Sequence, residues 1–148
     1  MNLRIGFANC QGTTGKRELF RRLLKKYDLL ILAETWMTNS SSTPSSALIR
    51  LTIPNNSGRG RSAYEGVMVL GKKSIRNYVD VIHLADDNRW FCLRCKDVFI
   101  MGGYFPPNNE LLHLQQFLDY ANLTRASDPD IPLVLIGDFN ARHSRVRG

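Results

Sequence analysis

The sequence predicts a layered α/β fold built on mixed sheets. Residues 3–33 contain a strand, a helix and a second strand, a pattern that places the two strands side by side and parallel. Strands joined by short turns follow over residues 67–105, which indicates antiparallel neighbours. A helix over residues 110–125 and an apolar strand over residues 133–136 complete the pattern. Parallel and antiparallel sections in one chain favour this fold over a Rossmann fold or a barrel.

The first predicted strand, residues 3–8, runs into a polar stretch that begins at Asn9. Threonines at residues 13–14 are in position to cap the helix that follows, in which leucine and phenylalanine recur at helical spacing. Residues 29–33, LLILA, are all apolar and predict a buried strand that ends at Glu34. Because the two strands are predicted to be parallel, Asn9 and Glu34 should lie at one edge of the sheet.

The next part of the chain is mostly polar. Residues 38–46, TNSSSTPSS, predict a loop without core contacts, and residues 47–53 a short strand. A second loop then carries Arg59 and Arg61 between glycines. These arginines could approach phosphates closely, or they could belong to an ordinary surface loop.

A run of strands follows the polar region. Its turns, GKK, ADDN and KD, are short enough for antiparallel pairing of consecutive strands. Two prolines at residues 106–107 stop the last strand, and an amphipathic helix follows over residues 110–125. The predicted strands of this run are residues 67–70, 74–84, 89–95 and 98–105.

The last strand, within LVLIGDFNAR, ends in an acid, an aromatic residue and an amide. Four consecutive apolar residues predict a strand buried on both faces. If the chain stays extended, Asp138 and Asn140 leave the same face and Phe139 the opposite one. A carboxylate there can hold Mg²⁺, and an amide can hold a phosphate oxygen. Taken alone, the motif is equally compatible with a turn that closes an ordinary strand.

Composition and charge narrow the function classes. The 148 residues, 43% of them hydrophobic, suffice for one core, and no apolar run approaches the roughly 18 residues of a membrane helix. The first residues lack a signal-peptide pattern, so we expect an intracellular protein, nuclear or cytoplasmic, and no membrane partner. The net charge is +7, and residues 1–27 carry seven Lys or Arg against one Glu. This basic helix could attract nucleic acid through residues such as Lys16 and Arg17, or it could be a solvated helix face.

The three cysteines are too few for a disulfide framework. Cys92 and Cys95 have the spacing of a zinc motif, but no second ligand pair follows at a suitable distance. Their odd separation in a strand also directs them to opposite faces. We therefore expect all three, including Cys10, to be packing residues.

Four predicted strand ends carry polar groups beside Gly, Thr or Pro, an arrangement typical of sites at the carboxyl ends of strands. In chain order, these ends are NCQG at residues 9–12, LAETW at 32–36, GGYFPPN at 102–108 and IGDFNAR at 136–142. The four motifs, in this order, resemble the endonuclease/exonuclease/phosphatase superfamily, which includes deoxyribonuclease I. The YFPPN stretch resembles the branch found in non-LTR retrotransposons.

The resemblance implies a four-layer α/β/β/α sandwich with two mixed sheets, and hydrolysis of phosphodiesters that depends on Mg²⁺ or Mn²⁺. By this resemblance Glu34 is the metal ligand, with Asn9 beside it. Asp138 activates water, while Asn140 and Tyr104 face the scissile phosphate. The expected substrate is nucleic acid, DNA in particular. The predicted phosphate contacts are Asn108, Arg142, Lys16 and Arg17.

The sequence departs from the family at two points. Gln11 stands where relatives have Asp, which weakens any proposal of a second metal there. The Ser-Asp-His motif that ends the family domain is missing, so we expect residues 1–148 to form an incomplete domain with little or no activity. His143 is expected to be a surface residue. A non-catalytic nucleic-acid-binding remnant and a phosphatase of the same superfamily are the alternatives.

Overall fold

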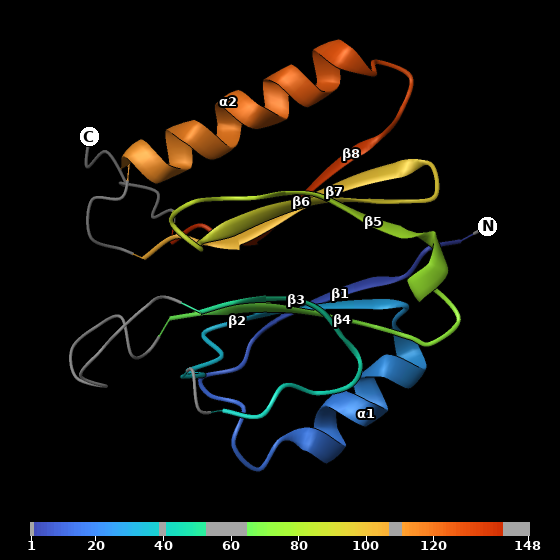
Figure 1. Ribbon diagram of the computed structural model, residues 1–148, viewed down its shortest axis with the longest axis vertical. Helices are drawn as coiled ribbons and strands as arrows, with labels where there is room; N and C mark the ends of the chain where they lie inside the picture. The colour runs from blue at the N-terminus through green and yellow to red at the C-terminus, as the bar shows by residue number, and fades with distance from the viewer. Residues whose placement is uncertain (1, 39–40, 53–64, 107–110, 141–148) are drawn as a thin grey trace, which may run out of the picture.

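The computed structural model describes residues 2–38, 41–52, 65–106 and 111–140. Two four-stranded sheets pack face to face, and one helix covers the outer face of each, so the chain forms four layers (Figure 1). This arrangement confirms the predicted α/β/β/α sandwich with two mixed sheets.

The first sheet has the strand order β1-β2-β4-β3. Strand β1 (Ile5–Asn9) pairs in parallel with β2 (Leu29–Ala33), as predicted. Strand β4 (Val67–Gly71) runs antiparallel to both β2 and β3 (Ala47–Leu51). All five residues of β2 are buried, because it has a strand on each side and a packed layer on each face.

The second sheet has the order β5-β6-β7-β8. Its first three strands, β5 (Val79–Leu84), β6 (Trp90–Cys95) and β7 (Val98–Tyr104), are consecutive antiparallel neighbours. Helix α2 (Leu111–Ser127) then crosses over the sheet, so that β8 (Leu133–Asp138) runs parallel to β7.

The turn at GKK does not join two neighbouring strands, contrary to the prediction. Strand β4 lies in the first sheet and β5 in the second, so the chain changes sheets there. The predicted strand over residues 74–84 begins only at Val79, since a short 3₁₀ helix, η2 (Arg76–Tyr78), precedes it. This helix turns the chain between the layers, which the strand-like composition of the segment did not reveal.

Strand β8 is only half-buried, although its apolar run predicted burial on both faces. Leu135 is 42% exposed. The reason is its position: within the described residues β8 pairs with β7 alone and lies at the border of the sheet.

Three apolar clusters fill the spaces between the layers. The central cluster joins the two sheets through residues such as Ile31 and Ile100. Phe117 of α2 anchors a second cluster, and Phe20 of α1 (Arg17–Lys26) anchors a third. The cysteines are buried and unpaired, with Cys92 and Cys95 in different clusters, which confirms their predicted role and opposite orientation.

Helix α1 lacks the predicted threonine cap. Its N-cap residue is Lys16, and no side chain there hydrogen-bonds the first turn. Gly15 has a φ of +74°, so the backbone reverses after the threonines and separates them from the helix start. In the part of the chain that the structure describes, neither helix combines the length and the apolar character of a membrane span.

Candidate active site at the carboxyl ends of the strands

The polar residues at the strand ends gather where the two sheets meet. Asn9 ends β1 and lies beside Ala33, so that Glu34 follows at the same edge. Asp138 ends β8 in the other sheet, in register with Tyr104. Parallel pairing inside each sheet aligns these ends, and the packing of the two sheets brings them together.

The Asn9 side chain joins two carboxylates from different sheets. Its Nδ2 donates to Glu34 Oε2 and, over 3.0 Å, to Asp138 Oδ2. Asn9 and Asp138 are 129 positions apart in the chain. The amide N–H₂ group therefore occupies the space between two negative groups that would otherwise repel each other.

The backbone leaves the regular strand conformation at three site positions. Gln11, Glu34 and Asn140 have φ values of +46°, +53° and +46°. Non-glycine residues seldom adopt this left-handed conformation, and besides turns they are found at functional sites, where the surrounding structure holds them in place. At Glu34 the backbone is held by the bond from Gly12 N to Glu34 O, which measures 2.8 Å.

Asn140 is fixed by hydrogen bonds rather than by strand geometry. The chain turns there, so the extended path assumed for Asp138 and Asn140 does not occur. Asn140 N donates to Asp138 Oδ1 over 3.1 Å, and Asn140 Nδ2 donates to the Phe105 carbonyl over 2.7 Å. Phe139 faces the other way, as predicted, and stacks on Phe105 at a centroid distance of 5.6 Å. Aromatic packing on one face thus supports the polar residues on the other.

Tyr104 is buried beside the carboxylates. Burial is the main cause that raises its pKa to about 12, followed by the negative charges of Glu34, Asp138 and Glu65. A hydrogen bond with Asn140 acts in the opposite direction. The phenol consequently stays protonated at neutral pH and can donate a hydrogen bond to an anionic oxygen.

Glu65 and Arg89 belong to this site but were missed in the sequence. Glu65 is 7% exposed, and its Oε1 lies 3.7 Å from Arg89 Nη2. Arg89 accepts the Tyr104 N–H at its carbonyl over 2.9 Å. Glu65 lies two positions before the strand predicted to begin at residue 67, and Arg89 is the first residue of the strand predicted over residues 89–95, so opposite charges stand at two strand starts. That pairing of charges was the available signal, but the sequence did not show that the two strand starts meet.

The donor set fits a hard divalent cation. Glu34 and Asp138 offer carboxylate oxygens, the ligand type that Mg²⁺ prefers, while Asn9 directs its Nδ2 toward both of them. Among the described residues, no three His, Cys, Asp or Glu side chains cluster closely enough to hold a metal by themselves. Mg²⁺ usually takes one or two carboxylates and completes its shell with water and substrate, so two carboxylates suffice.

Other predicted residues lie away from this edge or outside the described residues. Asn108 and Arg142 fall in the latter group, as do His143, Arg59 and Arg61. Lys16 is the exception, because its ammonium contacts the Cys10 and Gln11 carbonyls beside the edge, whereas Arg17 lines a pocket beside α1. His83 stacks on Tyr120, and His113 contacts Asp87.

Comparison with known proteins identifies the family. The family model described as the Endonuclease/Exonuclease/phosphatase family matches residues 6–147. The chain belongs to this family. A comparison with curated protein sequences finds no match.

Solved structures share the fold of this endonuclease/exonuclease/phosphatase chain at low sequence identity. One of them is NExo, a Neisseria 3′ phosphatase bound to a product DNA hairpin, which is 16% identical in sequence and has a TM-score of 0.60. The match covers 94% of this chain and 58% of the NExo chain. The endonuclease domain of TRAS1, a telomere-specific non-LTR retrotransposon, is 15% identical in sequence and has a TM-score of 0.59. The match covers 95% of this chain and 60% of the TRAS1 domain.

The human Nocturnin catalytic domain with bound sulfate is 16% identical, with a TM-score of 0.60 and coverage of 96% and 65%. The chain therefore spans less than two thirds of the length of each of these three structures.

Proposed function

We propose that the edge formed by Asn9, Glu34, Tyr104 and Asp138 belongs to a metal-dependent phosphodiesterase that acts on nucleic acid. The observation that carries this proposal is the contact of two carboxylates, one from each sheet, with the single amide of Asn9. Membership of the endonuclease/exonuclease/phosphatase family supports the same reaction class.

Each side chain would have a separate task in this reaction. Glu34 holds Mg²⁺ or Mn²⁺, which when bound offsets the negative charge that develops on the phosphate. Asp138 accepts a proton from the attacking water. Tyr104, protonated at neutral pH, donates a hydrogen bond to a phosphate oxygen, and Asn140 positions both partners through its contacts with Asp138 and Tyr104.

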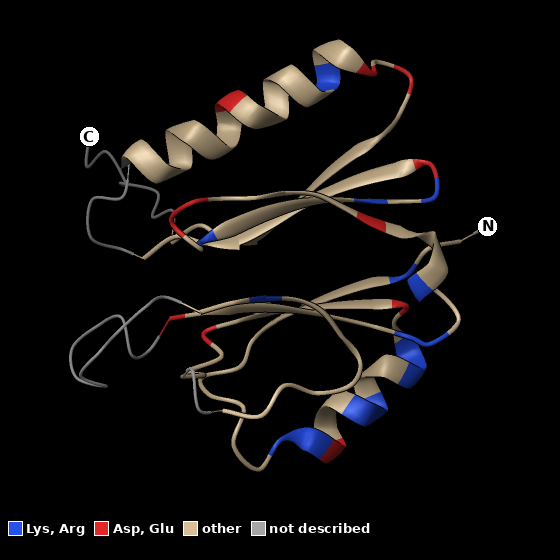
Figure 2. Cartoon of the chain, viewed as in Figure 1, with Lys and Arg blue, Asp and Glu red and all other residues tan. Residues whose placement is uncertain are grey.

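DNA is the substrate that the surrounding features favour. Lys and Arg gather along α1 on the outer face of the first sheet (Figure 2), and such a field attracts phosphates. The structural neighbours include an enzyme bound to a DNA hairpin and the endonuclease domain of a non-LTR retrotransposon. We therefore propose an endonuclease of retrotransposon type rather than a phosphatase of small molecules.

We expect the reaction to be slow in the 148-residue chain. His83 stacks on Tyr120 and His113 contacts Asp87, and both of these partners lie outside the candidate site. An imidazole near the phosphate is a common proton donor in such reactions, and neither contact places one there.

Plasmid nicking tests the proposal. The purified chain should convert supercoiled plasmid to the nicked form slowly in Mg²⁺ and not in EDTA. Asp138→Asn should lower the rate by at least about a hundredfold, the scale of losing an acid–base group. Glu34→Gln should lower the rate by a similar factor, because it removes the carboxylate that holds the metal. Asp119→Asn, a matched change in an exposed residue of α2, should leave the rate unchanged.

Two results would contradict this proposal. Nicking that survives both site substitutions would assign the activity to a contaminant or another site. Release of phosphate from small phosphomonoesters, faster than nicking, would favour the phosphatase alternative.

Non-catalytic binding of nucleic acid is the second candidate, favoured by the charge on α1 (Figure 2). It predicts that binding to duplex DNA weakens steeply with salt, because phosphate contacts release counterions. The double substitution Lys25→Gln and Lys26→Gln should reduce the slope of log K against log salt by about 2. A salt-independent affinity would rule this mode out.

A further inference from the structure

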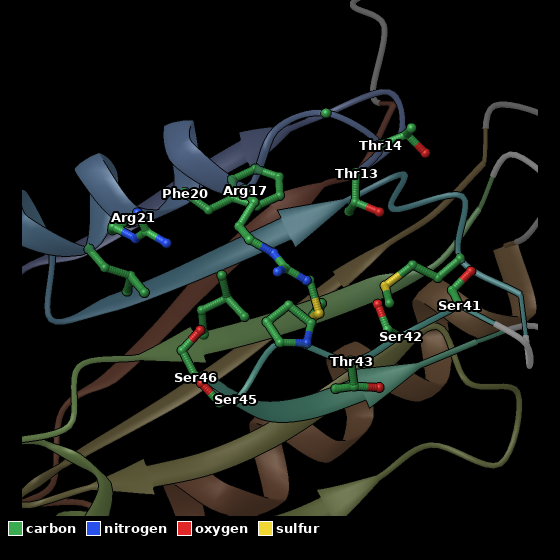
Figure 3. Close-up of a pocket in the computed structure, with 16 residues that line it drawn as sticks. Thr13, Thr14, Arg17, Phe20, Arg21, Ser41, Ser42, Thr43, Ser45 and Ser46 are labelled. Carbon is green, nitrogen blue, oxygen red and sulfur yellow. The ribbon is translucent and has the colours of Figure 1, made fainter.

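A pocket lies on the outer face of the first sheet, between α1 and the loop of residues 41–46 (Figure 3). Its volume is about 890 Å³, within the range of small-molecule sites. Its lining includes none of the residues of the catalytic edge.

Positive charge enters this pocket without a negative counterpart. The Arg17 side chain extends from α1 into the space in front of the loop (Figure 3). It is exposed, and among the described residues it has no ion-pair partner, whereas Arg21 is paired with Glu18 at 2.8 Å. No Asp or Glu lines the pocket. A guanidinium in such surroundings suits an anion, and its planar fork matches phosphate.

Hydroxyl side chains line the same pocket as the Arg17 guanidinium. Five of the lining hydroxyl side chains form no hydrogen bond with any other described residue, and they are Thr13, Thr14, Ser42, Ser45 and Ser46. Serine and threonine hydroxyls can donate to phosphate oxygens. They come from both walls, since the threonines precede α1 and the serines belong to the loop.

Two arginines outside the pocket lining hold the loop of residues 41–46 in place through hydrogen bonds. Arg50 of β3 donates to the Ser41 carbonyl over 2.9 Å and to Thr43 Oγ1 over 2.5 Å. Arg76 donates to the Ser45 carbonyl. Fixing the loop before a ligand arrives lowers the entropic cost of binding. These contacts explain why a loop that lacks apolar anchors can nevertheless form a pocket wall.

The floor of the pocket is apolar. Phe20, Met37 and Met68 are at most 7% exposed and close the pocket against the third cluster. The pocket thus presents the Arg17 guanidinium, a set of hydroxyl groups and an apolar floor. A ligand that fits all three has a phosphate that contacts Arg17 and the hydroxyls, and a flat apolar part that packs on the floor. We propose that this pocket binds the phosphate and base of a nucleotide, apart from the catalytic edge and independently of the reaction there.

Nuclear magnetic resonance on the full chain in EDTA tests this site. The probes are 5′-AMP, adenosine, inorganic phosphate and a single-stranded oligonucleotide without terminal phosphates. We expect AMP to shift the amides of Thr13, Arg17 and Ser45, and adenosine to leave them unchanged. Inorganic phosphate should bind at the same residues more weakly than AMP, because it lacks the base.

Substitutions separate this site from general charge attraction. Arg17→Ala should weaken AMP binding about tenfold or more, the usual scale for a charged hydrogen bond. Arg22→Ala removes an equally basic side chain of α1 that does not line the pocket, and should change the affinity less than twofold. The amide spectrum of each variant reports whether it is folded.

The two phosphate sources give different outcomes. Tighter binding of the oligonucleotide than of AMP, at the same amides, identifies a nucleic acid strand, and the reverse order identifies a free nucleotide. Shifts confined to Asn9, Glu34 and Asp138 would overturn the proposal, since the ligand would then occupy the catalytic edge. Equal losses for Arg17→Ala and Arg22→Ala, equal binding of adenosine and AMP, or no binding of any probe would overturn it as well.

Discussion

At the scale of single residues, the backbone conformation of Glu34 positions its carboxylate in the candidate site. Its φ of +53° lies in the left-handed region, which costs an L-residue about 1 kcal/mol. The same turn directs the carboxylate toward Asn9 at the end of the neighbouring strand. Local strain and a functional position thus coincide at one residue.

Glu34→Gly should therefore be more stable than Glu34→Ala. Both substitutions remove the carboxylate, but only glycine adopts the left-handed backbone without steric cost. We expect a difference of about 1 kcal/mol in the free energy of unfolding, measured with urea.

Glu18, within helix α1, provides the control. Glu18 lies in the first turn of this helix, and Glu18→Gly should be less stable than Glu18→Ala, because glycine loses more conformational freedom than alanine when a helix forms. The same order at both positions would show that Glu34 carries no backbone strain.

The ionisation of Tyr104 makes the stability of the folded protein depend on pH in the alkaline range. Its pKa is raised from 10.0 to about 12 by burial and by neighbouring carboxylates. As the pH rises through 10, the unfolded chain loses this proton first, so the folded state loses stability until the pH reaches about 12. The contribution is complete below pH 10.

Urea unfolding across this window should show a fall in stability that Tyr104→Phe reduces. Asp138→Asn should lower the Tyr104 pKa and end the fall at a lower pH, because one of the raising charges is gone. An unchanged pH profile in both variants would place the phenol away from the carboxylates.

At the scale of elements, the contact between β7 and β8 depends on glycine. Gly103 and Gly137 are partners in the register, one position before Tyr104 and Asp138. A Cβ on Gly137 would strike the carbonyl oxygen and the amide of Gly103. Glycine thus permits the close approach that sets Asp138 beside Tyr104.

Gly137→Ala should destabilise the protein by about 1 to 3 kcal/mol, the usual cost of overpacking. Gly71→Ala is the matched control, because its Cβ would meet the end of the flexible Leu48 side chain instead of backbone. We expect it to cost less than about 1 kcal/mol in the same urea titration. Equal costs would mean that β8 can shift to accept the methyl group.

At the scale of the whole molecule, the candidate site exists only when both sheets are assembled. Asn9 and Glu34 come from the first sheet, and Tyr104 and Asp138 from the second. A cation that binds this edge therefore binds the folded chain and not the unfolded one. Such a ligand stabilises the fold by mass action.

Mg²⁺ should raise the thermal midpoint of unfolding in a concentration-dependent manner. An ion at about 100 times its Kd contributes about 2.7 kcal/mol. Glu34→Gln should abolish this gain, whereas Asp119→Asn should retain it. A gain of equal size in Glu34→Gln would show that the ion binds elsewhere.

Local patterns predicted much of this protein. Apolar runs located β2 and β8, the strand–helix–strand opening predicted the parallel pair β1 and β2, and polar residues at strand ends located the candidate site. These features depend on neighbours in the chain, so composition and periodicity reveal them. The sheet to which a strand belongs does not depend on its neighbours in the chain. For that reason the sequence did not predict that the chain changes sheets after β4.

The sequence by itself determined the family, the order of the motifs and the residue types available for phosphate chemistry. Only the tertiary structure decided that Asn9 meets Asp138, that Glu65 and Arg89 join Tyr104, and that a polar loop forms a pocket with α1. Each of these contacts joins segments far apart in the chain. Such contacts depend on how the layers pack, and no local pattern of residues encodes that packing.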